Sequence, residues 1–223
     1  MKDKKKLIIF GLGEIGELAN FYFSTDSNYE IVAHTLDKDF LKDKSFCNKP
    51  IVPFENIQEF YDPKSHYLFI AIGYSKMNRL RTQKYNEAKS KGYNLASYIS
   101  SKATIFPNVM IGDNCFILED NTLQPFVKVG DNVTMWSGNH LGHHSSVLSN
   151  TFITSHAVIS GGVEIGEYCF IGVNATIRDH VKINSSCLIG AGSLILSNLE
   201  ADGVYVEKDT ERSRVPSSRI RSI

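Results

Sequence analysis

The feature of this sequence that most constrains its fold is a six-residue repeat in its second half. Every sixth residue from position 105 to position 195 is aliphatic or methionine. These positions hold Ile105, Ile111, Ile117, Leu123, Val129, Met135, Leu141, Val147, Ile153, Ile159, Ile165, Ile171, Ile177, Ile183, Ile189 and Ile195. A period of six matches neither the 3.6-residue period of a helix nor the simple alternation of a hairpin.

The repeat predicts a β-helix of short, flat strands joined by tight turns. Three hexapeptides would make one triangular coil, and the repeated stretch gives about five coils. Each aliphatic side chain would point inward and stack on its equivalent one coil away. Glycine often follows the inward residue, and we expect these glycines to give the corners their backbone freedom. They are Gly112, Gly130, Gly142, Gly166, Gly172 and Gly190.

The runs VMIGDNCFI, VEIGEYCFIGVNATI and VKINSSCLIGAGSLI resemble the hexapeptide-repeat acyltransferases, which form a left-handed parallel β-helix. This resemblance covers roughly residues 100–200. It implies a homotrimer in which acyl-CoA lies in the groove between neighbouring prisms. Elementary physics also favours an oligomer, because a prism has flat faces and little interior, and pairing those faces buries further surface.

Residues 5–100 have a different pattern, which is typical of a small α/β domain. The segment KKLIIFGLGEIGELANFYF indicates an apolar strand, a glycine-rich turn and an amphipathic helix. Further strands are expected at YEIVAHTLD, IVPFENI, HYLFIAIG and YNLASYIS, with a helix over residues 78–91. This βαβ order predicts a small, open, parallel sheet, which is about half of a complete dinucleotide-binding fold.

The glycine-rich turn matches the pattern G-x-G-x-x-G through Gly11, Gly13 and Gly16. Such a turn lets a phosphate approach the backbone amides at a helix N-terminus. Asp37 ends the second strand, where the Rossmann pattern places a contact to ribose. The alternative is that the glycines serve only the tight packing of the strand against the helix.

This order of domains is similar to the NeuD-like group of bacterial sugar acyltransferases, which includes N-acetyltransferases of nucleotide-linked amino sugars. The resemblance implies that Gly11, Gly13, Gly16 and Asp37 hold a sugar nucleotide, with Lys38 where many relatives carry a second acid. The predicted domains are a Rossmann-like, nucleotide-sugar-binding domain over residues 1–100, a left-handed β-helix acyltransferase domain over 101–200 and a C-terminal tail over 201–223.

Five of the seven histidines lie between positions 140 and 180. They are His140, His143, His144, His156 and His180. Acyl transfer from a thioester needs a base that works near neutral pH, and histidine is such a base. The reaction also needs hydrogen-bond donors where the oxyanion develops. Backbone amides of the turns are candidates for these donors, and Gly161 and Gly162 permit close approach.

The resemblance to the sugar acyltransferases places the base at His143, two residues after an inward-facing aliphatic residue. The acid that relatives carry beside the base is replaced by Gly142 and His144. Another group must then orient the imidazole, and the candidates are His144, Asn139 and a backbone carbonyl. A second histidine, which relatives often carry nine residues later, is Phe152 in this chain.

Residues 18 apart should stack on successive coils of the prism. His143 would then stack on Gly161, and His144 on Gly162, which leaves open space for an extended pantetheine arm. In relatives, the equivalent of Gly161 gives a backbone amide to the thioester. Residues near Val173 and Ala191 are implied by the same resemblance to contact the pantetheine.

A metal site is an alternative use of the histidines, because the γ-class carbonic anhydrases share this prism and bind zinc through three histidines. His144 and His180 have a suitable spacing for two ligands, but Ser185 stands where the third would be. No metal is therefore predicted. His140 is expected to be a surface turn residue, and Trp136 either packs under the sugar or fills a face between subunits.

Composition excludes several other classes of protein. Lysine plus arginine equals aspartate plus glutamate, at 24 each, so a strongly basic nucleic-acid surface is absent. No apolar run reaches the roughly 18 residues of a spanning helix, so no membrane insertion is expected. The four cysteines form no C-x-x-C pair, which favours a reducing, cytoplasmic location. The basic tail, with Arg212, Arg214, Arg219 and Arg221, is expected either to attract the CoA phosphates or to be solvated.

The predicted function is an acyl-CoA-dependent N-acyltransferase that uses acetyl-CoA as its cosubstrate. Its acceptor would be a nucleotide-linked amino sugar of bacterial surface glycan (lipopolysaccharide) biosynthesis, and a histidine would be the general base. An O-acetyltransferase of sialic acid or a related sugar is an alternative, because it needs the same base. A second alternative is a non-catalytic trimeric scaffold that binds a nucleotide sugar. A nicotinamide oxidoreductase is disfavoured by the small size of the N-terminal domain.

Overall fold

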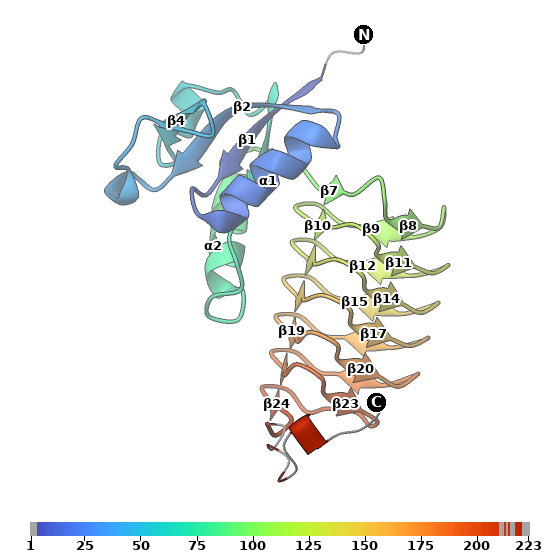
Figure 1. The fold of residues 1–223 in the computed structure, drawn as a ribbon. Coiled ribbons are helices and arrows are strands. Elements are labelled where there is room, and N and C mark those ends of the chain that lie inside the picture. The colour runs from blue at the N-terminus through green and yellow to red at the C-terminus, as the bar shows by residue number, and fades with distance from the viewer. Residues whose placement is uncertain (1–3, 210–211, 213, 215–216, 220–223) are drawn as a thin grey trace.

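The computed structural model describes residues 4–209, 212, 214 and 217–219, and they form an α/β domain followed by a β-helix (Figure 1). Arg221 of the basic tail lies outside the described residues. The strands of the α/β domain are β1 (Lys5–Phe10), β2 (Tyr29–Leu36), β3 (Ser45–Phe46), β4 (Lys49–Pro53), β5 (His66–Ile70) and β6 (Asn94–Leu95). Its helices are α1 (Glu14–Thr25) and α2 (Arg79–Ser90), with 3-10 turns η1 (Lys38–Phe40) and η2 (Ile57–Glu59).

The strands of the α/β domain form one sheet in the order β3-β4-β2-β1-β5-β6. All neighbouring pairs are parallel except β3 and β4, which form an antiparallel hairpin, so the sheet is mixed rather than purely parallel. The chain leaves β1 toward β2 and β4 and then crosses to β5 on the other side of β1. This crossing creates a switch point at the carboxyl ends of β1 and β5, where sheets of this kind bind their ligands.

Helices α1 and α2 lie on opposite faces of the sheet and differ in how much of their surface is buried. Helix α1 buries one stripe, formed by Gly16, Ala19 and Phe23 at helical spacing. Helix α2 is rich in charged residues, yet it buries Arg81 and Lys84 as well as apolar residues. It can do so because Tyr85 and Ala88 pack in the core of the sheet while Arg81 contacts the prism, so two of its sides are covered.

The prism consists of two-residue strands that stack into three flat sheets, which we call faces 1, 2 and 3. Face 1 contains β7 (Tyr98–Ile99), β10 (Phe116–Ile117), β13 (Thr134–Met135), β16 (Phe152–Ile153), β19 (Phe170–Ile171), β22 (Leu188–Ile189) and β24 (Val204–Tyr205). Face 2 contains β8 (Thr104–Ile105), β11 (Thr122–Leu123), β14 (His140–Leu141), β17 (Val158–Ile159), β20 (Thr176–Ile177) and β23 (Leu194–Ile195). Face 3 contains β9 (Met110–Ile111), β12 (Lys128–Val129), β15 (Ser146–Val147), β18 (Glu164–Ile165) and β21 (Lys182–Ile183).

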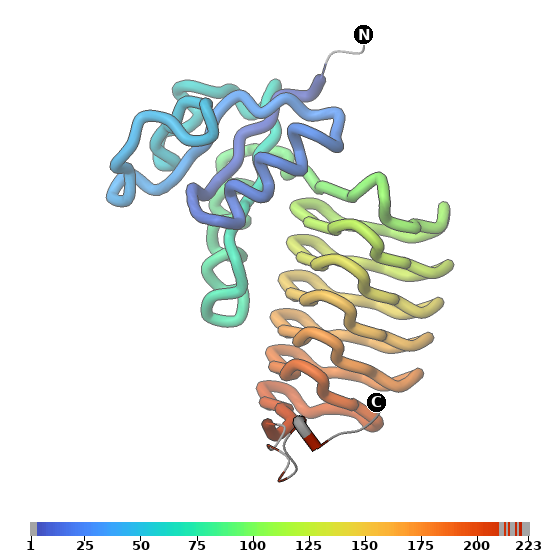
Figure 2. Tube along the Cα trace, in the orientation of Figure 1, coloured from blue at the N-terminus to red at the C-terminus, as the bar shows by residue number. Residues whose placement is uncertain are grey.

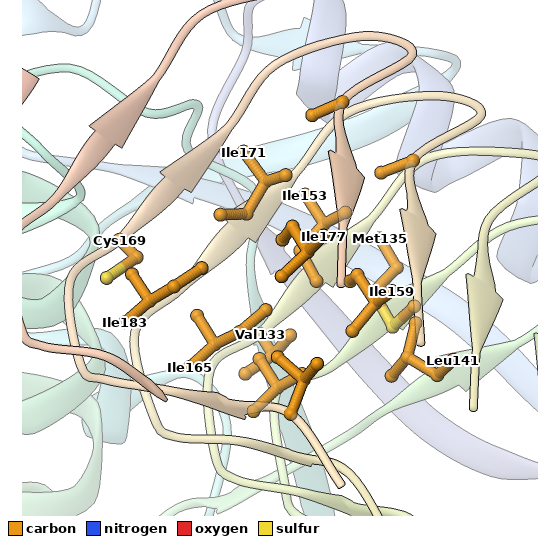
Figure 3. Packing of buried hydrophobic residues seen from close by; sticks show 14 of the residues in the cluster. Val133, Met135, Leu141, Ile153, Ile159, Ile165, Cys169, Ile171, Ile177 and Ile183 are labelled. Carbon is orange, nitrogen blue, oxygen red and sulfur yellow. The ribbon is translucent and has the colours of Figure 1, made fainter. Parts of the chain in front are cut away.

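The inward positions of the repeat form the core of the prism, as the six-residue period predicts. From Ile117 to Ile195 every one of the repeated aliphatic residues is buried, while Ile105 and Ile111 are partly buried in the first coil. Figure 3 shows side chains such as Ile153, Ile171 and Ile177 gathered in the interior. Paired strands match residues 18 apart, so each side chain packs on its equivalent in the next coil. Burying one such side chain contributes about 1.5–3 kcal/mol.

The left-handed backbone at the corners of the prism is not at the predicted glycines, which directly follow the inward aliphatic residues. Residues three places after the inward aliphatic have a positive φ angle, and most of them are not glycine. Asn114, Asn132 and Asn150 are three examples, with φ angles of 50°, 57° and 65°. The glycines directly after the aliphatics have a different reason. A Cβ on Gly172 would lie 2.5 Å from the backbone nitrogen of Ala191, so these glycines allow successive coils to approach.

The α/β domain covers face 1, beside the upper coils of the prism (Figure 2). Arg81 of α2 is 1% exposed and donates hydrogen bonds to the Thr134 hydroxyl and to the carbonyl oxygens of Asn132 (2.8 Å) and Thr151 (3.3 Å). Burial lowers the pKa of Arg81 to about 10. Because a buried cation without its hydrogen bonds is costly, these contacts fix α2 against the prism.

The ends of the prism differ from its regular middle. Strand β7 already pairs with β10, so pairing on face 1 starts at Tyr98. After Ile195 the pairing interval shortens, since Val204 pairs with Leu188, 16 residues earlier. The chain thus leaves the hexapeptide register at the last coil. Within the described part of the chain, no helix has the length and apolar character needed to cross a membrane.

Candidate functional site

A pocket of about 530 Å³ lies at the carboxyl ends of β1 and β5. It is lined by Phe10, Gly11, Leu12, Gly13, Glu14, Ile15, Leu36, Asp37, Phe40, Ala71, Ile72, Gly73, Leu80 and Lys84. Gly11, Gly13 and Asp37, which the sequence predicted to act together, therefore line one pocket, whereas Gly16 is buried and does not line it. Lys38 is exposed and does not line it.

The three glycines of the turn are there for two different reasons. Gly11 has a φ angle of +120°, and a Cβ at this residue would lie 2.5 Å from the carbonyl oxygen of Ala71. A Cβ on Gly16 would collide with the carbonyl oxygen of Gly11. These two glycines fit the packing alternative. Gly13 has ordinary backbone angles, and a Cβ there would meet nothing within 4 Å. Its missing side chain leaves the pocket open to a ligand.

A pair of alanine substitutions distinguishes these reasons. Gly16→Ala is expected to lower the free energy of unfolding by about 1–3 kcal/mol, because the new methyl group overlaps the backbone at Gly11. Gly13→Ala is expected to change it by less than about 1 kcal/mol, because alanine is a poorer N-cap but meets no neighbour there and restricts the unfolded chain. Urea unfolding of both variants measures the difference, and equal losses would contradict it.

Asp37 is held in place by a lysine that the sequence analysis did not select. The Lys84 ammonium lies 2.8 Å from one carboxylate oxygen of Asp37 and 2.8 Å from the carboxylate of Glu87. Lys84 is only 8% exposed, and these carboxylates outweigh its desolvation, so its pKa is raised. Next to Asp37, the backbone N–H of Lys38 donates to both carboxylate oxygens of Glu55 at 3.0 Å. The acidic end of β2 is thus held by an ion pair and by hydrogen bonds.

The predicted base, His143, lies on the corner between faces 2 and 3, which we call the 2–3 edge. Its backbone N–H donates to Oε1 of Gln124 at 2.9 Å, and its imidazole is exposed. A Cβ on Gly161 would lie 2.9 Å from Nε2 of His143, so the ring lies over Gly161, as predicted. Nδ1 of His143 lies 3.2 Å from Nδ1 of His144. Nε2 therefore remains available beside the half-buried backbone of Gly161.

The predicted open space beside His144 is occupied, and this part of the prediction is wrong. His144 turns toward the preceding coil and stacks on Phe126, with ring centroids 4.6 Å apart. The space over Gly162 holds the ring of His180, whose Nδ1 would lie 2.5 Å from a Cβ there. Left-handed corner residues direct their side chains back along the prism, which residue spacing alone does not reveal.

Asn139 cannot have either of its predicted roles, substrate binding or orientation of His143. It is 1% exposed and lies inside the prism. Its amide donates to Oδ1 of Asn121 at 3.0 Å and to the carbonyl oxygen of Trp136, and its own Oδ1 accepts from the backbone N–H of Ala157. These contacts satisfy all its polar groups in an internal ladder.

Two further positions from the sequence analysis lie on face 1. Phe152, at the position of the relatives' second histidine, is buried beneath Tyr74 of the α/β domain, with ring centroids 5.1 Å apart. Trp136 is partly buried against the aromatic cluster that joins α1 to the prism. His140 is on strand β14 of face 2 rather than in a turn.

Val173 and Ala191, the predicted pantetheine contacts, lie on the corner between faces 1 and 2, which we call the 1–2 edge. Both are exposed. His143 and Gly161 are on the 2–3 edge, so face 2 separates these two groups within one chain. The nucleotide pocket belongs to the domain on face 1. One chain therefore does not bring the predicted site residues together. Gly11, Gly16 and Asn139 are buried, and the others lie on separate parts of its surface.

The described residues contain no group of three or more histidine, cysteine, aspartate or glutamate side chains placed to hold a metal ion. The three cysteines in the prism, Cys115, Cys169 and Cys187, are buried in its core. Burial raises the pKa of the Cys115 thiol to about 12, so it is a packing residue rather than a nucleophile.

Comparisons with known proteins agree with this architecture. Residues 162–197 match the bacterial transferase hexapeptide (six repeats). The solved acetyltransferase domain of PglB from Neisseria gonorrhoeae has a TM-score of 0.75 and 23% identity, covering 88% of this chain and 94% of that one. The chain has the fold of the hexapeptide-repeat sugar acetyltransferases. A comparison with curated protein sequences gave no match.

Two more solved structures share both domains of this hexapeptide-repeat chain. PerB from Caulobacter crescentus has a TM-score of 0.77 and 22% identity, covering 87% of this chain and 90% of that one. WeeI from Acinetobacter baumannii has a TM-score of 0.62 and 17% identity, covering 89% and 94%. The predicted resemblance and the predicted fold class, a small Rossmann-like domain followed by a left-handed parallel β-helix, are confirmed.

Proposed function

We propose that this chain is an N-acyltransferase that moves an acyl group from acyl-CoA, with acetyl-CoA as the first candidate, to a nucleotide-linked amino sugar. The observation that carries the proposal is the exposed imidazole of His143, whose free Nε2 lies over Gly161 on an edge of the prism. The fold adds support. PerB was solved with CoA and GDP-perosamine, and the PglB acetyltransferase domain was solved with acetyl coenzyme A.

In the proposed reaction, the amine nitrogen of the sugar attacks the thioester carbonyl carbon, and a new C–N bond forms as the C–S bond breaks. Nε2 of His143 takes a proton from the attacking nitrogen and returns it to the leaving sulfur, so that CoA departs as a thiol. The backbone around Gly161 supplies hydrogen-bond donors to the developing oxyanion. Much of the rate comes from holding the amine and the thioester in contact, because this attack is chemically facile.

The pocket around Gly13 is proposed to bind the nucleotide of the acceptor. The backbone there is open to a phosphate at the N-terminus of α1, and Asp37 is in position to accept hydrogen bonds from a ribose. Glu14 and Glu17 lie in the first turn of α1. Lys84, the cation that lines the pocket, is already paired with Asp37 and Glu87. We therefore expect the phosphate to be held by backbone N–H groups near Gly13.

The site is proposed to form between subunits of a homotrimer. Face 2 has no charged outward residue; it presents Thr104, Thr122, His140, Val158, Thr176 and Leu194. Face 3 carries Lys128, Glu164 and Lys182, and face 1 is covered by the α/β domain. Face 2 is therefore the face suited to meet another prism. Docking there brings the 2–3 edge of one chain to the 1–2 edge of its neighbour, with acyl-CoA in the groove between them.

A thermal-shift titration tests the proposed function. The full chain is titrated separately with acetyl-CoA, with UDP-, GDP- and dTDP-linked amino sugars, and with NAD. Acetyl-CoA and one nucleotide family are expected to raise the melting temperature, because ligands that bind the native state stabilise it. A saturating ligand at 100 times its Kd adds about 2.7 kcal/mol. No response to acetyl-CoA would contradict acyl transfer, and a response to NAD alone would indicate redox chemistry.

Asp37→Ala is the control variant for this titration. It should weaken the response to the nucleotide sugar and leave the response to acetyl-CoA unchanged. Because Asp37 also pairs with Lys84, the variant starts from a lower melting temperature, and shifts are compared with its own baseline. The cytoplasmic location and the role in surface glycan synthesis stay predictions.

A further inference from the structure

Three aromatic rings lie in series on the 2–3 edge: Phe126, His144 and His143. The rings of Phe126 and His144 are stacked, with an angle of 28° between their planes. The ring of His144 then meets that of His143 edge-on, with 3.2 Å between the two Nδ1 atoms. The series ends at Nε2 of His143, the atom proposed to take the proton. We call this arrangement the ring series.

Phe126 occupies a position that suits few phenylalanines. It has a φ angle of 69° and is 53% exposed. The left-handed region is unfavourable for a bulky residue. The other left-handed residues of the regular corners are mainly small or polar: Asn114, Asp120, Asn132, Gly138, His144, Asn150, His156, Gly162, Tyr168, Asn174, His180, Ser186 and Gly192. Neither the turn nor the core requires a ring at Phe126, and a strained residue of this kind points to a role in function.

The histidine pair has no acid beside it. Among the described residues, no carboxylate is hydrogen-bonded to His143 or His144, and the acid nearest a prism histidine is Asp179, 4.0 Å from His180. Two Nδ1 atoms at 3.2 Å can share only one proton. When that proton is on His143, its Nδ1–H donates to Nδ1 of His144, and Nε2 of His143 carries the lone pair that a base needs.

We propose that His144 and Phe126 are positioning residues for the proposed acyl transfer, and this inference rests on that proposed function. His144 takes the place of the missing carboxylate by accepting the hydrogen bond from Nδ1–H of His143. When Nε2 of His143 takes the amine proton, the positive charge is shared across the hydrogen bond. The face of the Phe126 ring, which stacks on His144, then stabilises the part of the charge that reaches His144. The proton finally passes to the leaving sulfur, and the ring series returns to its neutral state.

The first test replaces His144 by alanine and by glutamate. The assay measures thiol release from acetyl-CoA with the member of a UDP-, GDP- and dTDP-linked amino sugar panel that the wild-type chain acylates. His144→Ala is expected to lower kcat by about 10- to 100-fold at unchanged KM for both substrates. The reason is that no acceptor then holds His143 in the tautomer with its proton on Nδ1. His144→Glu supplies a carboxylate acceptor and should retain kcat within about fivefold.

The second test uses the strain at Phe126. Phe126→Asn removes the ring and relieves the backbone, since asparagine tolerates the left-handed region. It is expected to raise the melting temperature and yet lower kcat by about three- to tenfold. Phe126→Tyr keeps the ring and should keep kcat within about twofold. A residue with a merely structural role would lower stability and activity together.

Three results would overturn the inference. One is a His144→Ala variant with kcat within about twofold of wild type. Another is a His144→Glu variant as slow as the alanine variant. The third is a Phe126→Asn variant that raises KM for the sugar with kcat unchanged, since Phe126 would then contact the acceptor directly. A wild-type chain that binds no acetyl-CoA would instead refute the proposed function, and the inference with it.

Discussion

His143→Ala is expected to abolish acyl transfer while both substrates still bind. Removing a general base costs about 10²- to 10⁴-fold in kcat. The imidazole is exposed and contacts no core residue, so the fold should remain intact. Thiol release from acetyl-CoA measures the rate, and thermal shifts with acetyl-CoA and the nucleotide sugar measure binding separately.

His66→Ala is the control for this experiment. His66 lies on β5 of the α/β domain, where its ring hydrogen-bonds the hydroxyl of Ser65 at 3.0 Å, away from the proposed site. This variant should keep the wild-type rate. If the His143→Ala enzyme stays within about threefold of wild type, the base is another group.

Two inactive variants should restore activity to each other when they are assembled into the same trimers. One is His143→Ala, which keeps its nucleotide pocket. The other is Gly13→Leu, which fills the pocket beside the glycine turn but keeps His143. Within one chain, the pocket is on the side of face 1 and His143 is on the 2–3 edge. In the proposed trimer, each pocket is therefore completed by the histidine of a neighbouring chain.

The expected recovery follows from counting subunits. In randomly mixed trimers, about one quarter of the sites pair an intact pocket with an intact histidine from the neighbour. Co-expressed variants should thus show about a quarter of the wild-type rate, while each variant alone shows background. If both catalytic parts came from one chain, every site would lack one of them. The mixture would then stay at background, and the intersubunit site would be rejected.

The core of the prism could be predicted from the sequence because its signal is strictly periodic. A single register fixed Ile117, Ile153 and Ile189 as inward residues, and all three are buried. The corners could not be assigned in the same way. Asn114, Asn132 and Asn150 look like ordinary surface residues until the backbone shows their left-handed angles and their amide ladder. The glycines that follow the inward aliphatic residues do have a structural role, but that role is to let successive coils approach each other rather than to shape the corners.

The candidate site was predictable where it depends on a local motif and not where it depends on packing between domains. Gly11, Gly13 and Asp37 share a pocket because strand ends meet at one edge of a sheet. Lys84 and Arg81 gave no such signal, since charged residues on a helix usually face solvent. They are buried because α2 is covered on two sides. Phe126 was missed because its partner, His144, turns toward the preceding coil.

The contact between α2 and face 1 limits how a chain of this kind can adapt to acceptors of different length. With Arg81 locked onto β13, the pocket cannot slide along the prism. The partners of Arg81, at positions 132, 134 and 151, flank His143 in the chain, so this contact and the histidine edge lie at the same level of the prism. Inserting 18 residues between Thr134 and His143 would move that edge by one strand spacing, about 4.8 Å, and leave the core continuous. The distance between pocket and histidine can thus change only in steps of one coil. Smaller changes in that distance would depend on the side chains at the edges of the prism.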